Sequence, residues 1–443
     1  MTGLPGGWRV RRLRELLAEP LANGRSVKDR AGGFPVLRLT AMTAAGIDLR
    51  KSKEGDWTAD EAKRFLVKQG DVLIVRGNGS LKLVGRAGLV GPVDQPVAYP
   101  DTLIRVRPDL KQIDARYLSL AWSSDVVRRQ IESMARTTAG IYKVNQRGLE
   151  EVEVPFPPLD EQLRIVEILE GHLSRLDAAT ANLRTASRRA AALKKSILLD
   201  SVPDVSAYPA EWKSVTVADA GKIELGRQRH PDWHTGPNMR PYLRVANVFE
   251  DRIDTSDVME MHWPEETFER FKLRPGDVLL NEGQSPEWLG RPAIYRGEPA
   301  ETAFTNSLMR FKAYDGVLPE FALLVFRRHM HAGRFTRESR ITTNIAHLSA
   351  TRLKKVEFPI PPLEVQQQIV AQTDESLTAV GRLTRAVDAG RKREKALRRM
   401  LLAAAFSGRL TGRSLNLDSV EHQALKMEPE VVLAGRQEEA LLW

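Results

Sequence analysis

The sequence contains no cysteine among its 443 residues. This absence excludes disulfides, cysteine-based zinc sites and thiol nucleophiles together, and it suits a reducing cytoplasm. Long apolar runs are also absent, because no stretch approaches the ~20 residues that a membrane-spanning helix needs. The arginines between Arg9 and Arg14 are not followed by the apolar segment of a secretory signal. We therefore expect a cytoplasmic protein that has no membrane partner.

A duplication organises what the sequence does contain. Residues 152–159 and 356–363 read Val-Glu-Val-Pro-Phe-Pro-Pro-Leu and Val-Glu-Phe-Pro-Ile-Pro-Pro-Leu, 204 positions apart, and Trp8 and Trp212 keep the same offset. A constant offset over most of a chain indicates duplication of a whole unit rather than a shared local motif. Most loop residues between the matched segments differ, which suggests two similar tasks with different specificity.

Each copy begins with a globular part whose pattern is mixed and strand-rich. Gly70-Asp71 and Gly276-Asp277 are turns that feed aliphatic runs typical of strands. In the first copy we expect a flexible polar loop at 76–80, strands at 84–90 and 103–106, and a single helix at 117–128.

A long helix is expected after each Pro-Pro pair. Proline is tolerated just before a helix but not inside it, so Pro157-Pro158 and Pro361-Pro362 fix the two starting points. Each run covers about 35 to 40 residues, or ~50 to 60 Å. Because one apolar stripe on so long a helix needs a partner stripe, we expect the two helices to pair antiparallel as a coiled coil. The alternative is that each helix packs on its own globular part. The predicted seam and partner-binding residues are Leu169, Leu176, Leu183 and Ile197 in the first helix and Val380, Val387, Leu397 and Leu401 in the second.

Two catalytic motifs are matched only in part. Amino-methyltransferases carry an Asn/Asp-Pro-Pro-aromatic loop, but here Phe156 and Ile360 precede the proline pairs, so no amide or carboxylate can hold the target amine. Residues 203–204 and 211–213 match the Pro-Asp…Glu-x-Lys pattern of nucleases, whose acidic groups hold a metal ion that activates water. The first copy has Gly-Trp-Arg at 7–9, with no carboxylate, so the duplication already accounts for that segment.

One short histidine motif suggests metal binding, and two basic segments suggest phosphate binding, but neither pattern is specific. His329 and His331 can ligate a metal, but two such histidines are more often surface residues. Basic residues crowd segments 184–195 and 391–399, which fits either a solvated helix face or contact with phosphate or an acidic partner. We predict no catalytic residue, no metal and no cofactor.

Polar and basic side chains gather in matching loops of the two globular parts. The chain has 67 Lys and Arg against 57 Asp and Glu, a net charge of +10, and a basic excess favours a polyanionic partner such as nucleic acid. Arg, Asn, Gln and Ser are also the side chains that read base edges in the major groove. The predicted DNA-binding residues are Arg76, Asn78, Ser80, Lys82, Arg86, Tyr142, Lys143 and Asn145 in the first part, and Asn281, Gln284, Ser285, Arg291, Asn344 and His347 in the second.

Taken together, these motifs resemble the DNA-specificity subunit of type I restriction–modification enzymes. The similarity spans residues 4 to about 412, and no single motif carries it. Two departures concern individual sites: Val365 stands opposite Glu161, and segment 138–141 lacks the asparagine of its counterpart. The residues that carry the resemblance are Trp8 and Trp212, the Gly-Asp-Val-Leu segments at 70–73 and 276–279, the Thr-Thr-Asn-Ile segment at 342–345, the Pro-Pro-Leu segments at 157–162 and 361–363, and the closing segment 405–410.

The resemblance implies a non-catalytic α+β subunit with a pseudo-twofold internal repeat. Two similar strand-rich target-recognition domains, joined by two long antiparallel coiled-coil helices, would each read one half of a bipartite, asymmetric site on double-stranded DNA. Two N6-adenine methyltransferase subunits and the restriction subunits, which carry translocase and nuclease activity, would be the partners. Readers on one face of a duplex sit about one turn, or ~34 Å, apart, so we expect a gap of roughly 5 to 8 base pairs.

The predicted boundaries follow the repeat. Two other interpretations stay open: a stand-alone restriction protein that cleaves DNA itself, and a helical scaffold that binds only protein. The expected segments are target-recognition domain 1 at 1–158, a central helix at 159–202, target-recognition domain 2 at 203–362, a distal helix at 363–412 and an acidic tail at 413–443.

Overall fold

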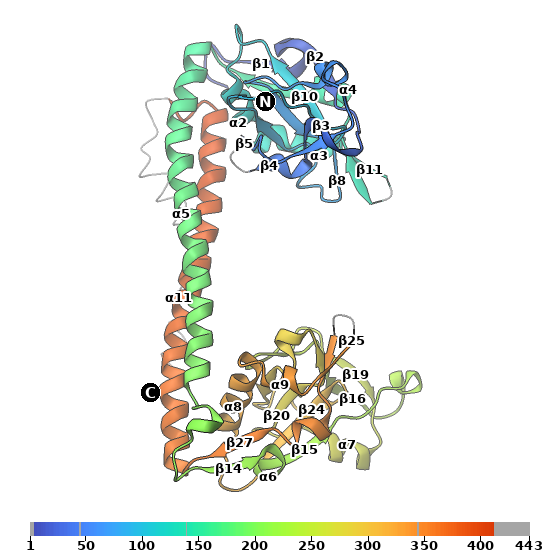
Figure 1. The fold of residues 1–443 in the computed structure, drawn as a ribbon, viewed down its shortest axis with the longest axis vertical. Helices are drawn as coiled ribbons and strands as arrows, with labels where there is room; N and C mark the ends of the chain where they lie inside the picture. Colours follow the sequence, from blue (N-terminus) through green and yellow to red (C-terminus); the bar gives the residue numbers. More distant parts are fainter. Residues whose placement is uncertain (1–3, 44–45, 139, 343–344, 412–443) are drawn as a thin grey trace. The chain divides into compact units, whose positions relative to one another are not determined.

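The computed structural model describes residues 4–43, 46–138, 140–342 and 345–411. The chain divides into two compact units, which we call unit 1 (residues 1–183 and 388–443) and unit 2 (residues 184–387). Each unit holds a globular domain and a part of both long helices, α5 (Leu159–Asp200) and α11 (Leu363–Phe406) (Figure 1). Across the described ranges, no helix is long and apolar enough to span a membrane.

A four-stranded antiparallel sheet forms the centre of unit 1. Its strands lie in the order β2 (Leu17–Asn23), β10 (Leu103–Pro108), β7 (Val72–Val75) and β9 (Ala87–Leu89). Successive side chains of a strand point to opposite faces. Val72 and Ile74 therefore join the core under helices α2 (Ala115–Trp122) and α3 (Asp125–Met134), while Leu73 and Val75 join a second core on the other face.

Smaller elements surround this sheet. The two-stranded pairs are β1 (Arg9–Arg12) with β13 (Glu153–Phe156), β3 (Asp29–Leu37) with β6 (Ser52–Gly55), and β4 (Met42–Thr43) with β5 (Gly46–Ile47). A three-stranded sheet contains β11 (Arg136–Thr138), β12 (Ile141–Lys143) and β8 (Gly77–Asn78). The short helices are α1 (Ala59–Ala62) and α4 (Gln146–Glu150), with 3-10 turns at Leu13–Leu16, Leu39–Ala41 and Lys63–Phe65.

Unit 2 repeats this order. Its central sheet is β15 (Gly221–Leu225), β24 (Leu308–Ala313), β20 (Val278–Asn281) and β22 (Pro292–Ile294). Two two-stranded pairs lie around it, β14 (Lys213–Thr216) with β27 (Glu357–Ile360) and β17 (Val248–Phe249) with β18 (Arg252–Ile253). One three-stranded sheet has the order β19 (Met259–His262), β16 (Met239–Leu243) and β23 (Ala303–Phe304). The other has the order β21 (Gly283–Gln284), β26 (Ile345–His347) and β25 (Arg340–Thr342). The helices are α6 (Val217–Ala220), α7 (Glu265–Phe271), α8 (Pro319–His331), α9 (Arg334–Arg337) and α10 (Ala350–Leu353), with 3-10 turns at Val205–Ala207, Pro231–His234 and Pro286–Trp288.

The duplication holds at the level of strand register. Arg9 pairs with Phe156 and Lys213 pairs with Ile360, so both partners shift by 204 positions between the copies. The small pairs β4–β5 and β17–β18 repeat with a shift of 206. Insertions in loops therefore move the numbering without changing the pairing, and the predicted α+β repeat is confirmed.

Three local predictions for unit 1 were wrong. The expected helix at 117–128 is two helices, because Ser124 caps α3 by accepting a hydrogen bond from the Val127 amide (3.4 Å). Within 84–90 only Ala87–Leu89 is strand. The expected flexible loop at 76–80 contains the ordered strand β8.

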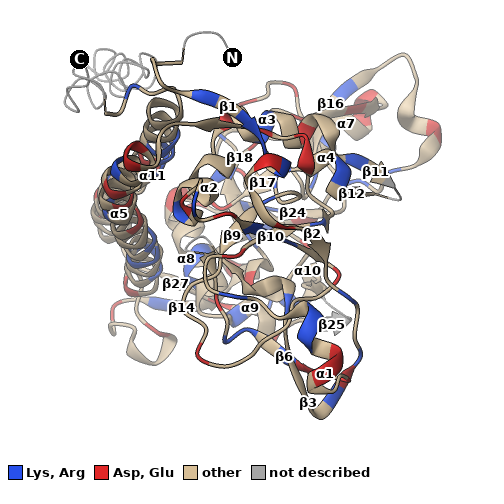
Figure 2. Ribbon diagram, turned by 90° about the horizontal axis from the view of Figure 1, so that it is seen from above, with Lys and Arg blue, Asp and Glu red and all other residues tan. Residues whose placement is uncertain are grey.

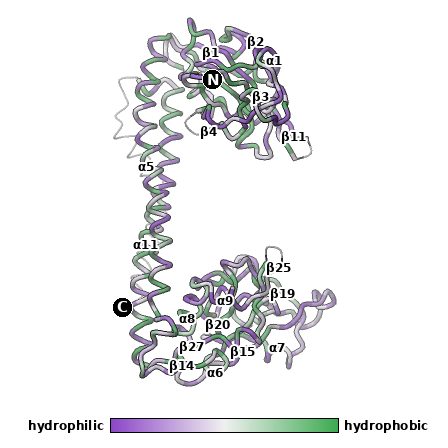
Figure 3. Tube along the Cα trace, viewed as in Figure 1, coloured by the Kyte–Doolittle hydropathy of each residue, from purple (hydrophilic) through white to green (hydrophobic). Residues whose placement is uncertain are grey.

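The long helices are slightly longer than expected, at 42 and 44 residues. In unit 1 they pair antiparallel, because Glu161 bonds Thr411, Asp177 pairs with Arg398, and Leu183 packs where Gly390 leaves room. Hydrophobic and hydrophilic stretches alternate along both helices (Figure 3). Among the predicted seam residues, Leu169, Val380, Val387 and Leu401 are buried, whereas Leu176, Leu183, Ile197 and Leu397 are half-buried.

The helices also pack on the globular domains, so the alternative packing is realised alongside the pairing. Leu169 and Phe406 belong to the main core of unit 1, where the Phe406 ring lies edge-on to Tyr117 at 5.5 Å. In unit 2, Val202, two residues after the end of α5, lies in the main core, and Ile369 and Val370 of α11 pack against that core. Each domain therefore receives the start of one long helix and the end of the other.

A buried glutamine fastens the start of each long helix. Gln162 accepts a hydrogen bond from the Asp114 amide (2.9 Å) and donates to the Pro157 carbonyl oxygen (2.9 Å). Gln366 makes the same two bonds, to the Leu318 amide (2.9 Å) and the Pro361 carbonyl oxygen (2.8 Å). Both glutamines are fully buried with these groups satisfied, so their loss leaves backbone groups without partners.

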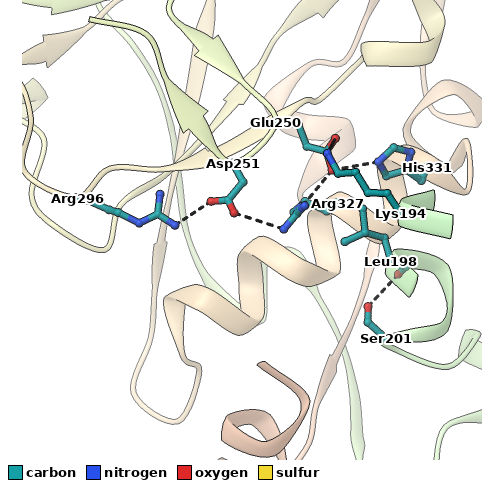
Figure 4. A network of polar contacts seen from close by, with 8 residues as sticks. All are labelled: Lys194, Leu198, Ser201, Glu250, Asp251, Arg296, Arg327 and His331. Carbon is teal, nitrogen blue, oxygen red and sulfur yellow. Dashed lines mark hydrogen bonds and ion pairs between the residues drawn. The ribbon is translucent and has the colours of Figure 1, made fainter. Parts of the chain in front are cut away.

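A network of charges ties α5 to the domain of unit 2 (Figure 4). The Glu250 carboxylate pairs with Lys194 (2.9 Å), Arg327 (3.1 Å) and His331 (3.1 Å). Burial alone would raise the pKa of Glu250, but the His331 hydrogen bond and the charges of Arg327 and Lys194 outweigh it and hold that pKa far below its usual range. Unit 1 has Ser123 where unit 2 has Arg327, and its domain pairs with α5 through Arg116 and Glu170 instead (3.4 Å).

The buried histidine of α8 predicts a pH-dependent stability of unit 2. Burial lowers the pKa of His329 to about 4, and its Nε2 lies 3.0 Å from the Glu357 carbonyl oxygen. Below the ordinary histidine pKa of about 6.5 the unfolded chain takes up a proton that the folded chain refuses, so stability falls with pH between these two values. We expect this group to remove about 2 kcal/mol from the free energy of unfolding as the pH falls from about 7 to about 5.

Urea unfolding of the whole chain at the two pH values measures this effect. The His329→Gln variant should lose that part of the pH dependence, whatever its absolute stability. The exposed His234 provides the matched control, because its substitution by Gln should leave the pH dependence unchanged. An unchanged pH dependence in His329→Gln would contradict the prediction.

Candidate DNA interface

The predicted site residues of unit 1 meet where β7 ends. The Arg76 amide donates to the Thr102 carbonyl oxygen (2.9 Å), and the Arg76 carbonyl oxygen accepts from the Val144 amide (2.9 Å). The chain then forms β8, in which Asn78 pairs with Tyr142 and Gly77 with Lys143. We call β8, β11, β12 and the loop 79–86 the hairpin surface of unit 1; it lies at the opposite end of the domain from β1 (Figure 1).

Strand pairing decides which side chains this surface exposes. Arg136, Ile141 and Lys143 share one face of the β11–β12 hairpin, because Arg136 pairs with Lys143 and residues two apart point the same way. All three are exposed, Ile141 to 44%. Tyr142 points to the other face and packs partly against the main core. An exposed isoleucine next to a pair of cations is suited to contact with an anionic partner that also offers apolar groups, as DNA bases do.

The remaining predicted residues of unit 1 are close together but have different local partners. The Asn78 side-chain oxygen accepts from the Ser80 amide (2.9 Å), and Arg86 donates to the Thr43 carbonyl oxygen (3.2 Å). Asn145 caps α4 by accepting from the Gly148 amide (2.8 Å), so it already has a structural role. Lys82 is exposed, whereas Arg76, Asn78, Ser80 and Arg86 are half-buried.

The hairpin surface of unit 1 is uniformly basic. Segments 76–86 and 136–147 contain no Asp or Glu. Figure 2 shows basic residues on β11 and β12. A surface rich in cations attracts phosphate groups. The cations of these two segments are Arg76, Lys82, Arg86, Arg136, Lys143 and Arg147.

Unit 2 builds the same frame with other side chains. The Glu282 amide donates to the Ser307 carbonyl oxygen (3.0 Å), and the Glu282 carbonyl oxygen accepts from the Leu348 amide (2.9 Å). Gly283 then pairs with His347, and Gln284 pairs with Ala346. We call β21, β25, β26 and the loop 285–291 the hairpin surface of unit 2.

One predicted DNA-binding residue, Asn281, is buried in this structure. Asn281 is fully buried as the last residue of β20, where unit 1 has Val75. Neither its side-chain oxygen nor its side-chain nitrogen has a hydrogen-bond partner within the described ranges. The strand runs one residue further than its apolar pattern indicated, so this amide lies inside the domain and cannot reach DNA in this conformation. Asn344, another predicted residue, lies outside the described residues.

The other predicted residues of unit 2 remain candidates. The Gln284 side-chain oxygen accepts from the Ser285 amide (3.0 Å), and both residues are half-buried. His347 is exposed and its Nδ1 lies 3.4 Å from Glu282. The Arg291 guanidinium stacks over Phe249 at 4.7 Å, and burial lowers its pKa. Its Nε has no hydrogen-bond partner in the part of the chain that the structure covers.

Sequence reasoning missed Glu282 and the exposed hairpin residues. Glu282 occupies the position of Arg76, and the duplication would have revealed this once the offset of 206 was applied to the loop. Ile141 and Ile345 are both exposed, to 44% and 50%, at matching places on the two hairpins. Exposure of an aliphatic side chain depends on strand pairing and cannot be read from the sequence alone.

The residues weighed for metal chemistry have separate partners. His329 contacts the Glu357 backbone, whereas His331 pairs with Glu250. Asp204 pairs with Arg328 (3.4 Å) and caps the 3-10 turn that follows it. Over the described ranges, no group of three or more His, Asp or Glu side chains is arranged to hold a metal ion.

Comparison with known proteins identifies the family. The model of the type I restriction modification DNA specificity domain matches residues 5–185 and 209–381, one match for each copy of the repeat. The chain belongs to this family. Two matches in one chain agree with the predicted two-domain organisation, while the detailed boundaries stay a prediction.

Parts of this chain are similar to curated specificity subunits. The Escherichia coli EcoKI specificity subunit is 30% identical over 203 residues, which are 45% of this chain and 43% of that subunit. The StySPI specificity subunit of Salmonella potsdam is 26% identical over 210 residues, 47% of this chain and 45% of that subunit. The chain thus spans less than half the length of these two relatives.

Two solved structures have the same fold. One is a chain from a structure that concerns the complex assembly and conformational transition of the type I R-M system. Its TM-score is 0.73 at 21% identity, over 93% of this chain and all of that one. The HsdS subunit from Thermoanaerobacter tengcongensis has a TM-score of 0.54 at 21% identity, over 92% of this chain and 98% of that one. At this identity the likeness establishes the fold, and the expected architecture of two α+β domains with long helices is confirmed.

Proposed function

We propose that this chain is the DNA-recognition subunit of a type I restriction–modification complex, in which each unit reads one half of a bipartite, asymmetric site. The observation that carries the proposal is the repeated hairpin surface. Identical backbone hydrogen bonds hold Arg76 and Glu282, yet the side chains they present differ in charge. A common frame with different chemistry is what two readers of different sequences require.

The long helices have two proposed roles. Their lengths, 42 and 44 residues, correspond to about 63 and 66 Å of helix at 1.5 Å per residue. We infer that this length sets the gap between the two half-sites. The helices also offer exposed apolar side chains such as Leu193 and Leu383, which suit the docking of methyltransferase subunits.

Bond-making is assigned to the partners. Relatives of this chain are named specificity subunits, and two N6-adenine methyltransferase subunits together with restriction subunits would supply the chemistry. In this proposal the chain positions the complex on DNA. The methyltransferase subunits methylate DNA at sites where both units have bound their half-sites.

Selection from random DNA tests the proposal. The purified chain and its methyltransferase partner would be mixed with a randomised duplex library, and bound molecules sequenced. We expect enrichment of two short defined blocks separated by a gap of fixed length. Enrichment of one uninterrupted block, or of none, would contradict the proposal; the latter would favour a scaffold that binds only protein. Cleavage of the library by the chain alone with magnesium would favour a stand-alone nuclease.

A further inference from the structure

Arg76 directly follows β7 in unit 1, and Glu282 directly follows β20 in unit 2. The two residues occupy equivalent positions, which we call the slot, but carry opposite charges. Arg76 and Glu282 have matching backbone partners, Thr102 and Val144 in one case and Ser307 and Leu348 in the other. Each is followed by a glycine that pairs with an exposed residue of the hairpin, Lys143 or His347. The slot therefore holds two cations in unit 1 and a carboxylate beside a histidine in unit 2.

The side chains of this slot are available to a ligand. Arg76 is half-buried, and its guanidinium makes one long hydrogen bond, to the Asp101 carbonyl oxygen (3.4 Å). Glu282 is 30% exposed, and its Oε2 lies 3.4 Å from His347 Nδ1. Its Oε1 has no partner among the residues that the structure describes. Both groups thus retain unused hydrogen-bonding capacity at the surface.

A carboxylate at a DNA-binding surface repels phosphate groups, so it is favourable only where it accepts a hydrogen bond from a base. In the major groove, a carboxylate accepts from the cytosine N4 amino group, whereas an arginine donates two bonds to the O6 and N7 atoms of guanine. The two slots have the chemistry for different bases at matching positions of the two half-sites.

Resting on the proposed function, we propose that Arg76 and Glu282 are the equivalent specificity-determining residues of the two units, with Arg76 reading a guanine and Glu282 reading a cytosine. The matching backbone hydrogen bonds hold the two residues at equivalent positions, and the chemistry of each side chain determines which base it recognises. The side chains of Lys143 and His347 lie over the adjacent glycines, Gly77 and Gly283.

The test uses the full chain with its methyltransferase partner and maps methylated sites across a genome. Glu282→Gln keeps the size of the side chain but replaces an acceptor by the amide that prefers adenine. We expect discrimination in favour of cytosine to fall roughly five- to hundredfold at one position of one half-site. Arg76→Lys keeps the charge but removes the planar fork, and it should lower discrimination in favour of guanine at one position of the other half-site.

Each variant contains its own control for folding, because the unaltered half-site must stay unchanged. Glu266→Gln on α7 and Arg64→Lys are matched substitutions at exposed positions outside both hairpin surfaces, and they should leave the motif as it is. A motif unchanged at every position in Glu282→Gln and Arg76→Lys would overturn this assignment while the proposed function stands. A wild-type chain with no split motif would overturn the proposed function itself.

Discussion

Replacing residues 203–355 with the corresponding segment of a related specificity subunit is expected to change one half of the recognised DNA site completely and to leave the other half unchanged. The exchanged segment contains the whole hairpin surface of unit 2, from Glu282 to His347, and none of that of unit 1. Each base pair that is no longer matched costs about 1 to 3 kcal/mol, so a changed half-site lowers affinity for the original sequence by several orders of magnitude. Mapping of methylated sites measures the result.

The reciprocal exchange is the matched control. Residues 1–151 correspond to the same boundary shifted by 204 positions, and their exchange should alter only the other half-site. Strand β27 stays in the first chimaera, and its pairing with β14 uses backbone groups that tolerate a change of side chains. If either exchange altered both half-sites, independent reading by the two units would be refuted.

Removing one heptad from each long helix is expected to shorten the gap between the half-sites. Deletion of 176–182 from α5 and 391–397 from α11 removes facing stretches of the antiparallel pair in unit 1, and it keeps Leu183 beside Gly390. The deletion shortens each helix by ~10 Å at 1.5 Å per residue. The gap should therefore shrink by at most about three base pairs at 3.4 Å per base pair, and methylation at the original spacing should be lost.

The control for this experiment is a deletion that shifts the register of one long helix against the other. A deletion in α5 alone slips the apolar seam against α11, so it should abolish recognition rather than shorten the gap. The lost Asp177–Arg398 pair is partly exposed, and such pairs contribute little to stability. Recognition of an unchanged gap after the paired deletion would show that the helices do not set the spacing.

The repeated scaffold could be predicted from the sequence because a duplication leaves a signal that is independent of local propensity. The shared offset of Trp8 and Trp212 and the two Pro-Pro pairs located both domains and both long helices. The break at Ser124 was also signalled, since Ser-Ser-Asp after an apolar run is an N-cap pattern, but the helical spacing on either side concealed it.

The details of the site could not be predicted in the same way. Gly77 and Asn78 have the composition of a flexible loop, and only pairing with residues more than 60 positions away makes them a strand. Asn281 has the chemistry of a base-reading residue, yet its position at the end of a buried strand removes it from the surface. Exposure is a property of tertiary packing, so polar residue types alone select too many candidates.

Genome-wide mapping of adenine methylation tests the central claim most directly. It would compare cells that carry this chain and its methyltransferase partner with cells that lack either one. The account predicts methylation at a single split motif, two defined blocks around a fixed gap, only when both proteins are present. Methylation of the same sites without this chain, or at an uninterrupted motif, would contradict the account.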